Sequence, residues 1–135
     1  MLNDKMKDYY DVALLLLRIG VGLIFIVAGW GKLTGIENTA GFFDNIGIPM
    51  PVVMAWVVAI VEFAGGIMVL AGLYMRIPAL LLAVIMVVAI LTTKLDADNI
   101  FRAMRLDLVL LLMSLSLFIT GSGKISLNSM LGIKE

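Results

Sequence analysis

The chain has 135 residues, of which 62% are hydrophobic and 15% are charged, and its mean hydropathy is +1.11. This apolar share exceeds that of a soluble domain, so the composition indicates one integral membrane domain over residues 1–135. Ten basic and ten acidic residues give a net charge of zero, which offers no basic surface for nucleic acid. Because the chain contains no Cys and no His, we expect no metal site, no thiol chemistry and no covalently bound cofactor.

The first apolar run carries charge inside it. It covers residues 12–33, close to the length of about 20 residues that a helix needs to cross a hydrocarbon core, and it contains Arg18 and Lys32. Since Arg18 interrupts the run and three more apolar runs follow, an uncleaved transmembrane helix is a better interpretation than a secretory signal. The glycines of this run predict close packing against a neighbouring helix.

A segment of mixed polarity separates the first two runs. Within residues 34–51 the apolar side chains recur at helical spacing, which predicts a short amphipathic helix lying in the membrane interface. The second predicted span covers residues 52–73 and carries Glu62 near its centre. It follows two prolines, which are tolerated in the first turn of a helix.

Two further spans complete the chain. A short turn leads into the third, residues 78–94, and the fourth covers residues 103–121, with Asp107 near its start and a glycine-rich stop at its end. The sequence therefore predicts an all-α, polytopic membrane protein. Its expected architecture is an antiparallel four-helix transmembrane bundle with a short interfacial helix between the first two spans.

Four spans would place both chain ends on the same side of the cell membrane. Basic residues outside the helix interiors number five on that side and four on the other, which favours a cytoplasmic N-terminus by one charge. The first group is Lys5, Lys7, Arg76, Lys124 and Lys134, and the second is Lys32, Lys94, Arg102 and Arg105.

The charges within the spans are the candidate site. A lone charge at the centre of a membrane helix costs about 2.5–3.5 kcal/mol, so Arg18 and Glu62 are expected to face the bundle interior and to pair. Lys32 and Asp107 lie toward the opposite face and form a second predicted pair. These four residues are the candidate ligand-binding pocket. The sequence identifies no catalytic residue. Two alternatives stay open: the charges only lock the helices together, or Arg18 extends to the interface and pairs with nothing.

Several short motifs occur in a characteristic order. They are Arg-Ile-Gly and Gly-Trp-Gly-Lys-Leu in the first span, Gly-Ile-Pro before the second, Val-Glu-Phe-Ala-Gly-Gly within it, Gly-Leu-Tyr-Met-Arg after it, and Gly-Ser-Gly-Lys-Ile-Ser-Leu after the fourth. Over residues 14–128 this order resembles the DoxX family of small four-helix prokaryotic membrane proteins. The resemblance maps the family's recurrent polar positions onto Arg18, Lys32, Glu62, Arg76 and Asp107. The chain departs from it at Lys94, where relatives often carry His, and at Asn128, where the late Ser-Leu-Asp motif has Asp.

The resemblance implies a role beside a redox enzyme. The family name is attached to the membrane subunit of a thiosulfate:quinone oxidoreductase and to membrane partners of oxidative-stress and sulfur-handling enzymes. We therefore expect a membrane subunit or docking partner for a soluble redox enzyme, not catalytic alone, in contact with quinone and the lipid bilayer. Two alternatives are a small-molecule binding or transport protein, taking an anionic or quinone-like ligand inside the bundle, and a structural membrane protein. Homo-oligomerisation is left open.

Overall fold

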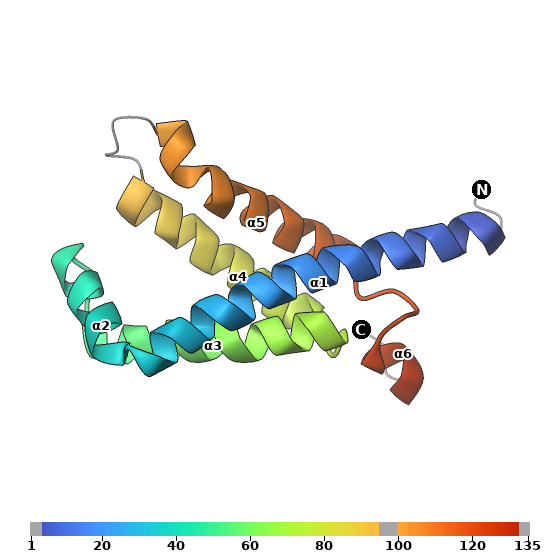
Figure 1. The fold of residues 1–135 in the computed structure, drawn as a ribbon, viewed down its shortest axis with the longest axis horizontal. Helices are drawn as coiled ribbons and strands as arrows, with labels where there is room; N and C mark the ends of the chain where they lie inside the picture. Colours follow the sequence, from blue (N-terminus) through green and yellow to red (C-terminus); the bar gives the residue numbers. More distant parts are fainter. Residues whose placement is uncertain (1–3, 95–99, 133–135) are drawn as a thin grey trace.

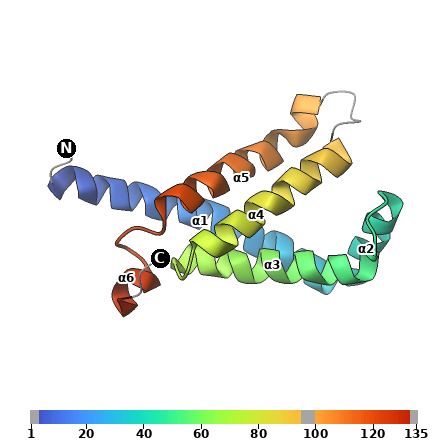
Figure 2. The ribbon, with the colours of Figure 1, turned by 180° about the vertical axis from the view of Figure 1, so that it is seen from behind.

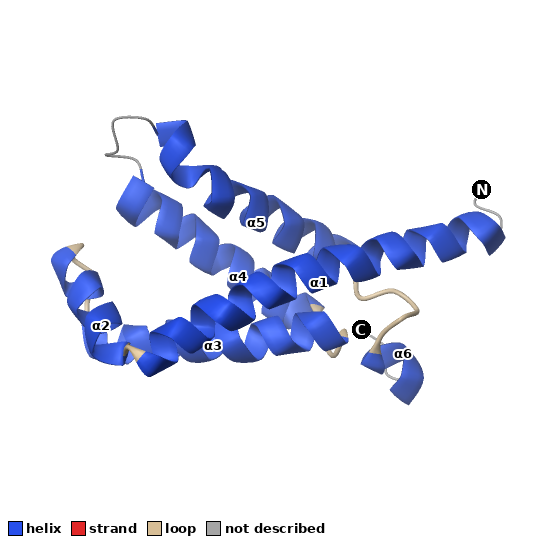
Figure 3. Ribbon diagram, in the orientation of Figure 1, coloured by secondary structure: helices blue, strands red, loops and turns tan. Residues whose placement is uncertain are grey.

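The computed structural model describes the backbone of residues 4–94 and 100–132 and the side chains of residues 6–92 and 105–132. Its elements are α1 (Asp4–Thr34), α2 (Ile36–Asn45), α3 (Pro51–Ala71), α4 (Arg76–Ala89), the π-helical turn η1 (Ile90–Lys94), α5 (Ile100–Thr120) and α6 (Leu127–Leu131). Within these described residues the remaining chain is loop, as Figure 3 shows. The predicted all-α class is confirmed.

The main difference from the predicted boundaries is at the start of α1. The first predicted span begins at residue 12, whereas α1 begins at Asp4. The extra turns are polar and precede the apolar run. The apolar run therefore marks only the part of α1 that is suited to lipid, while the helix itself continues beyond it.

Among the residues whose side chains the structure describes, two helices are long and apolar enough to cross a membrane, Met6–Thr34 and Pro51–Ala71, and Arg76–Thr92 forms a shorter apolar helix. Large apolar side chains are exposed on the long helices, among them Leu16, Val27 and Ile119. Exposed apolar surface of this extent is rare on a soluble monomer and favours contact with lipid.

The long helices form two pairs. α1 packs against α3, α4 packs against α5, and the short turn between α3 and α4 joins the pairs. Figures 1 and 2 show that the pairs lie close together near this turn and diverge toward the end at which α2 lies. The start of α1 and α6 lie at the opposite end. The main core, which includes Phe25, Val69 and Leu82, fills the space between the helices.

Glycines set the register between α1 and α3. A methyl group added at Gly29 would lie 2.4 Å from the backbone nitrogen of Phe63, and one added at Gly66 would lie 2.8 Å from the backbone nitrogen of Ile26. Such short distances leave no room for a side chain, so the backbones are in close contact, as the small residues predict. Gly31, in contrast, faces open space.

The predicted short amphipathic helix is present as α2. Its buried residues Ala40 and Phe43 form a small cluster with Ala55 of α3, separate from the main core, and its acidic residues Glu37 and Asp44 are exposed. α2 therefore packs mainly on α3 at the end where the two helix pairs diverge. Its position in a membrane interface stays a prediction.

Candidate functional site

Arg18 of α1 is buried, with 1% of its surface exposed, and backbone carbonyls surround its guanidinium. Nε donates to Val69 O at 3.1 Å and Nη2 donates to Leu70 O at 2.9 Å. Nη1 donates to Ser122 O at 3.0 Å and also to Ile125 O. The last carbonyls of a helix lack a full set of helical partners and carry the negative end of its dipole. Arg18 therefore caps α3 and ties the segment after α5 to it.

The predicted pair of Arg18 with Glu62 is wrong, because the register of α1 on α3 separates the two side chains. Gly29 packs on Phe63, so Glu62 lies opposite the second half of α1. The Arg18 guanidinium binds carbonyls seven and eight residues beyond Glu62, which is about 10 Å further along α3 at 1.5 Å per residue. The depth estimate from the sequence placed both residues within reach because it had no information on this offset.

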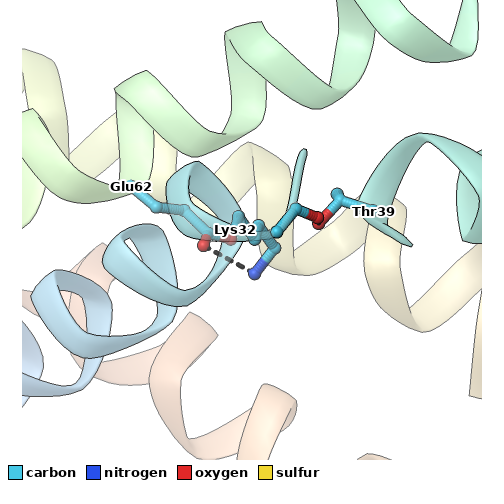
Figure 4. A network of polar contacts seen from close by, with 4 residues as sticks. Lys32, Thr39 and Glu62 are labelled. Atoms are coloured by element: carbon cyan, nitrogen blue, oxygen red, sulfur yellow. Dashed lines mark hydrogen bonds and ion pairs between the residues drawn. The ribbon is translucent and has the colours of Figure 1, made fainter. Parts of the chain in front are cut away.

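Glu62 instead pairs with Lys32. The Nζ atom of Lys32 lies 2.8 Å from Oε2 of Glu62, and Figure 4 shows the two groups joined at the contact of α1 with α3. The Glu62 side chain is 3% exposed and the Lys32 side chain is 29% exposed. This arrangement satisfies the deeply buried carboxylate and leaves part of the ammonium group accessible.

Asp107 of α5 lies near this ion pair. It lines the same cavity as Lys32 and Glu62 and is close enough to act electrostatically on Glu62. The predicted direct pair of Lys32 with Asp107 is therefore replaced by the pair of Lys32 with Glu62, with Asp107 beside it. Three of the four predicted site residues come together, and Arg18 occupies a different place.

The cavity has a volume of about 680 Å³, and its lining residues come from both helix pairs and from α2. We call it the wedge cavity. Apart from the three ionisable residues and Thr92, its walls are apolar side chains and backbone from α2, α3, α4 and the loop after α2. Its volume and its few polar groups are typical of a small-molecule site. Among the residues that the structure describes, no group of three acidic side chains is arranged to hold a metal ion.

Sequence reasoning missed the residues that hold the C-terminal segment in place. The side-chain oxygen of Asn128 accepts from Tyr74 N at 3.0 Å, and its own backbone nitrogen donates to Gly72 O at 3.2 Å. Oδ1 of Asp11 accepts from Lys124 N at 3.3 Å. In the sequence, the late Ser-Leu-Asn motif that ends at Asn128 was the feature that could have indicated these contacts. Gly72 has a φ of +73°, and an added methyl group would lie 2.8 Å from Nη2 of Arg18, so only glycine fits.

The sequence model of the DoxX family matches residues 13–95, which is more than half of the chain. The chain belongs to the DoxX family. The matched region includes Arg18, Lys32 and Glu62 and ends before Asp107. The resemblance seen in the motifs is thereby confirmed.

Curated proteins similar to this DoxX chain have membrane or redox names. "Putative oxidoreductase CatD" of Bacillus subtilis (strain 168) is 41% identical over 123 residues, 91% of this chain and 90% of that protein. "Inner membrane protein YqjF" of Escherichia coli (strain K12) is 40% identical over 78 residues, 58% of each chain. "Inner membrane protein YphA" of the same strain is 35% identical over 65 residues, 48% of this chain and 46% of that protein. No solved structure is significantly similar. The DoxX chain is a membrane protein.

Proposed function

We propose that this DoxX protein is a membrane subunit that docks a soluble redox or sulfur-handling enzyme and contacts quinone in the wedge cavity. In this proposal α1, α3, α4 with η1, and α5 each cross the cell membrane, and both chain ends lie on the cytoplasmic side. The divergent end of the bundle, with α2, then lies at the opposite face. The name of the Bacillus relative, "Putative oxidoreductase CatD", supports the redox assignment.

The observation that carries the proposal is the composition of the wedge cavity. Its apolar walls suit an isoprenoid or alkyl chain, while Lys32, Glu62 and Asp107 supply hydrogen-bonding groups for a polar ring. A quinone combines these two parts in one molecule. Because the chain has no Cys and no His, electrons would have to be carried by the quinone and by the partner enzyme.

Co-purification tests this function. The chain would be extracted from its native membrane in mild detergent, and bound quinone and protein partners would be identified by mass spectrometry. We expect bound quinone together with a soluble redox enzyme. Val57→Trp, which fills the cavity, should reduce the bound quinone. Val53→Trp is the matched control, because Val53 is an exposed residue of α3 that does not line the cavity.

The same experiment separates the alternatives. Bound quinone or another small molecule without any protein partner would favour a binding or transport protein, which the cavity also supports. Purification with neither a ligand nor a partner would leave a structural membrane protein and would end the proposal. An anionic ligand held by Arg18 is disfavoured, because Arg18 lies outside the cavity and four carbonyls already accept from it.

A further inference from the structure

The polar groups of the wedge cavity differ in whether they have a hydrogen-bonding partner. Lys32 and Glu62 satisfy one another at 2.8 Å. Asp107, which is partly buried, has neither a hydrogen bond nor an ion pair with any residue in the described ranges 6–92 and 105–132. An ionised carboxylate can only accept hydrogen bonds. Because Asp107 lines the cavity, its carboxylate can accept from a donor that enters there.

The charges of the cavity lining select against an anion. One ammonium group and two carboxylates line the cavity, and the ammonium is already bound to one of the carboxylates. The lining residues thus carry a net charge of −1 when all three groups are ionised. An anionic ligand would meet an unneutralised like charge, whereas a group that donates a hydrogen bond would meet an acceptor.

Lys32 offers a complementary contact beside Asp107. Its ammonium group has three donors, and one of them is used by Glu62. The side chain is 29% exposed, so a second N–H can reach the cavity. A hydroxyl group can donate to a carboxylate such as that of Asp107 and can also accept from an ammonium group such as that of Lys32. A carbonyl oxygen can use only the Lys32 contact.

We propose that the wedge cavity selects the reduced, hydroquinone form of a lipophilic quinone, and that Asp107 is the residue that determines this preference. The inference rests on the proposed quinone contact and adds to it the redox form that binds. A phenolic hydroxyl donates to Asp107 and accepts from Lys32, while the hydrocarbon tail lies among the apolar side chains of α3 and α4. No chemical step is included, since the assignment concerns binding alone.

A pair of matched probes tests this inference. Decyl-hydroquinone and the corresponding decyl-benzoquinone would be titrated calorimetrically into the full chain in lipid nanodiscs, without oxygen. We expect the hydroquinone to bind about tenfold more tightly, as expected for one additional hydrogen bond to a charged group. Asp107→Asn should remove that preference or reverse it, because an amide can donate to the carbonyl of the benzoquinone.

Two further variants distinguish a change in ligand binding from a purely structural effect of the Asp107 substitution. Asp107→Glu keeps the acceptor and should retain the preference for hydroquinone. Asp44→Asn changes an exposed carboxylate of α2 outside the cavity lining and should alter neither affinity. Equal binding of the two probes by the natural chain, or equal losses for both in Asp107→Asn, would overturn the inference and leave the quinone contact standing. If neither probe binds, the inference and the proposed quinone contact fail together.

Discussion

The two basic residues in the apolar part of α1, buried Arg18 and partly exposed Lys32, are bound in different ways. Arg18 is surrounded by four backbone carbonyls from α3 and from the segment after α5. Lys32 has a single carboxylate partner and faces a cavity. The first arrangement uses most of the donors of the guanidinium and leaves no room for a ligand, so it is structural. The second keeps accessible polar groups beside apolar walls. Of the two residues, only Lys32 therefore leaves polar groups accessible to a ligand.

The largest expected effect comes from removing the Arg18 cap. Hydrogen bonds to a charged group contribute about 1.5–3 kcal/mol each, so Arg18→Met should lower the free energy of unfolding by at least about 3 kcal/mol. Denaturant unfolding in detergent would measure the change. Arg105→Met is the control, because Arg105 is exposed on α5 and its loss should matter little. Equal and small effects of the two substitutions would contradict a structural role for Arg18.

Gly29 fixes the register of α1 on α3, which separates the Arg18 cap from the Lys32–Glu62 ion pair. Gly29→Ala would place a methyl group 2.4 Å from the Phe63 backbone, and overpacking of this kind costs about 1–3 kcal/mol. We expect the upper part of that range, since backbone cannot move aside as a side chain can. Gly31→Ala meets nothing within 4 Å and should be neutral or slightly stabilising. Thermal melting of both variants in one detergent is the measurement, and matching melting temperatures would argue against the close contact.

The Lys32–Glu62 pair should show energetic coupling. Lys32→Met leaves the Glu62 carboxylate buried without a counter-charge and should cost about 2 kcal/mol, less than a fully buried pair because Lys32 is partly exposed. Adding Glu62→Gln should recover part of this loss, which a double-mutant cycle would detect. The same cycle for Arg18 with Glu62 should be additive within about 0.5 kcal/mol, since the two groups do not pair. Coupling in the second cycle and additivity in the first would reverse the assignment.

The smallest expected effect concerns the attachment of the C-terminal segment. Asn128→Ala removes the acceptor of Tyr74 N and should cost about 1 kcal/mol, the usual contribution of a neutral hydrogen bond. Asn128→Asp keeps an acceptor at the same place and should retain the attachment. Hydrogen exchange at Tyr74 would report both variants. Unchanged protection in Asn128→Ala would show that this bond does not hold the segment.

Much of this fold could be predicted from the sequence. Apolar runs located the long helices, periodicity located α2, and the cost of a buried charge predicted that Arg18 and Glu62 face inward, as their exposures of 1% and 2% confirm. The partners of these charges could not be predicted. They depend on how far α1 is displaced along α3, which Gly29 and Gly66 fix through contacts between backbones. The positions of the charged residues along the chain carry no information on the displacement of α1 along α3.

The cap around Arg18 also has a consequence for biosynthesis. Its four carbonyl acceptors are synthesised at two different times. Those of Val69 and Leu70 are synthesised with α3, and those of Ser122 and Ile125 only after α5. When only α1 has been synthesised, the acceptors of the Arg18 guanidinium do not yet exist. The nascent chain must keep Arg18 hydrated or held by the insertion machinery until α3 supplies the first two acceptors, and the cap is complete only when the segment after α5 has emerged.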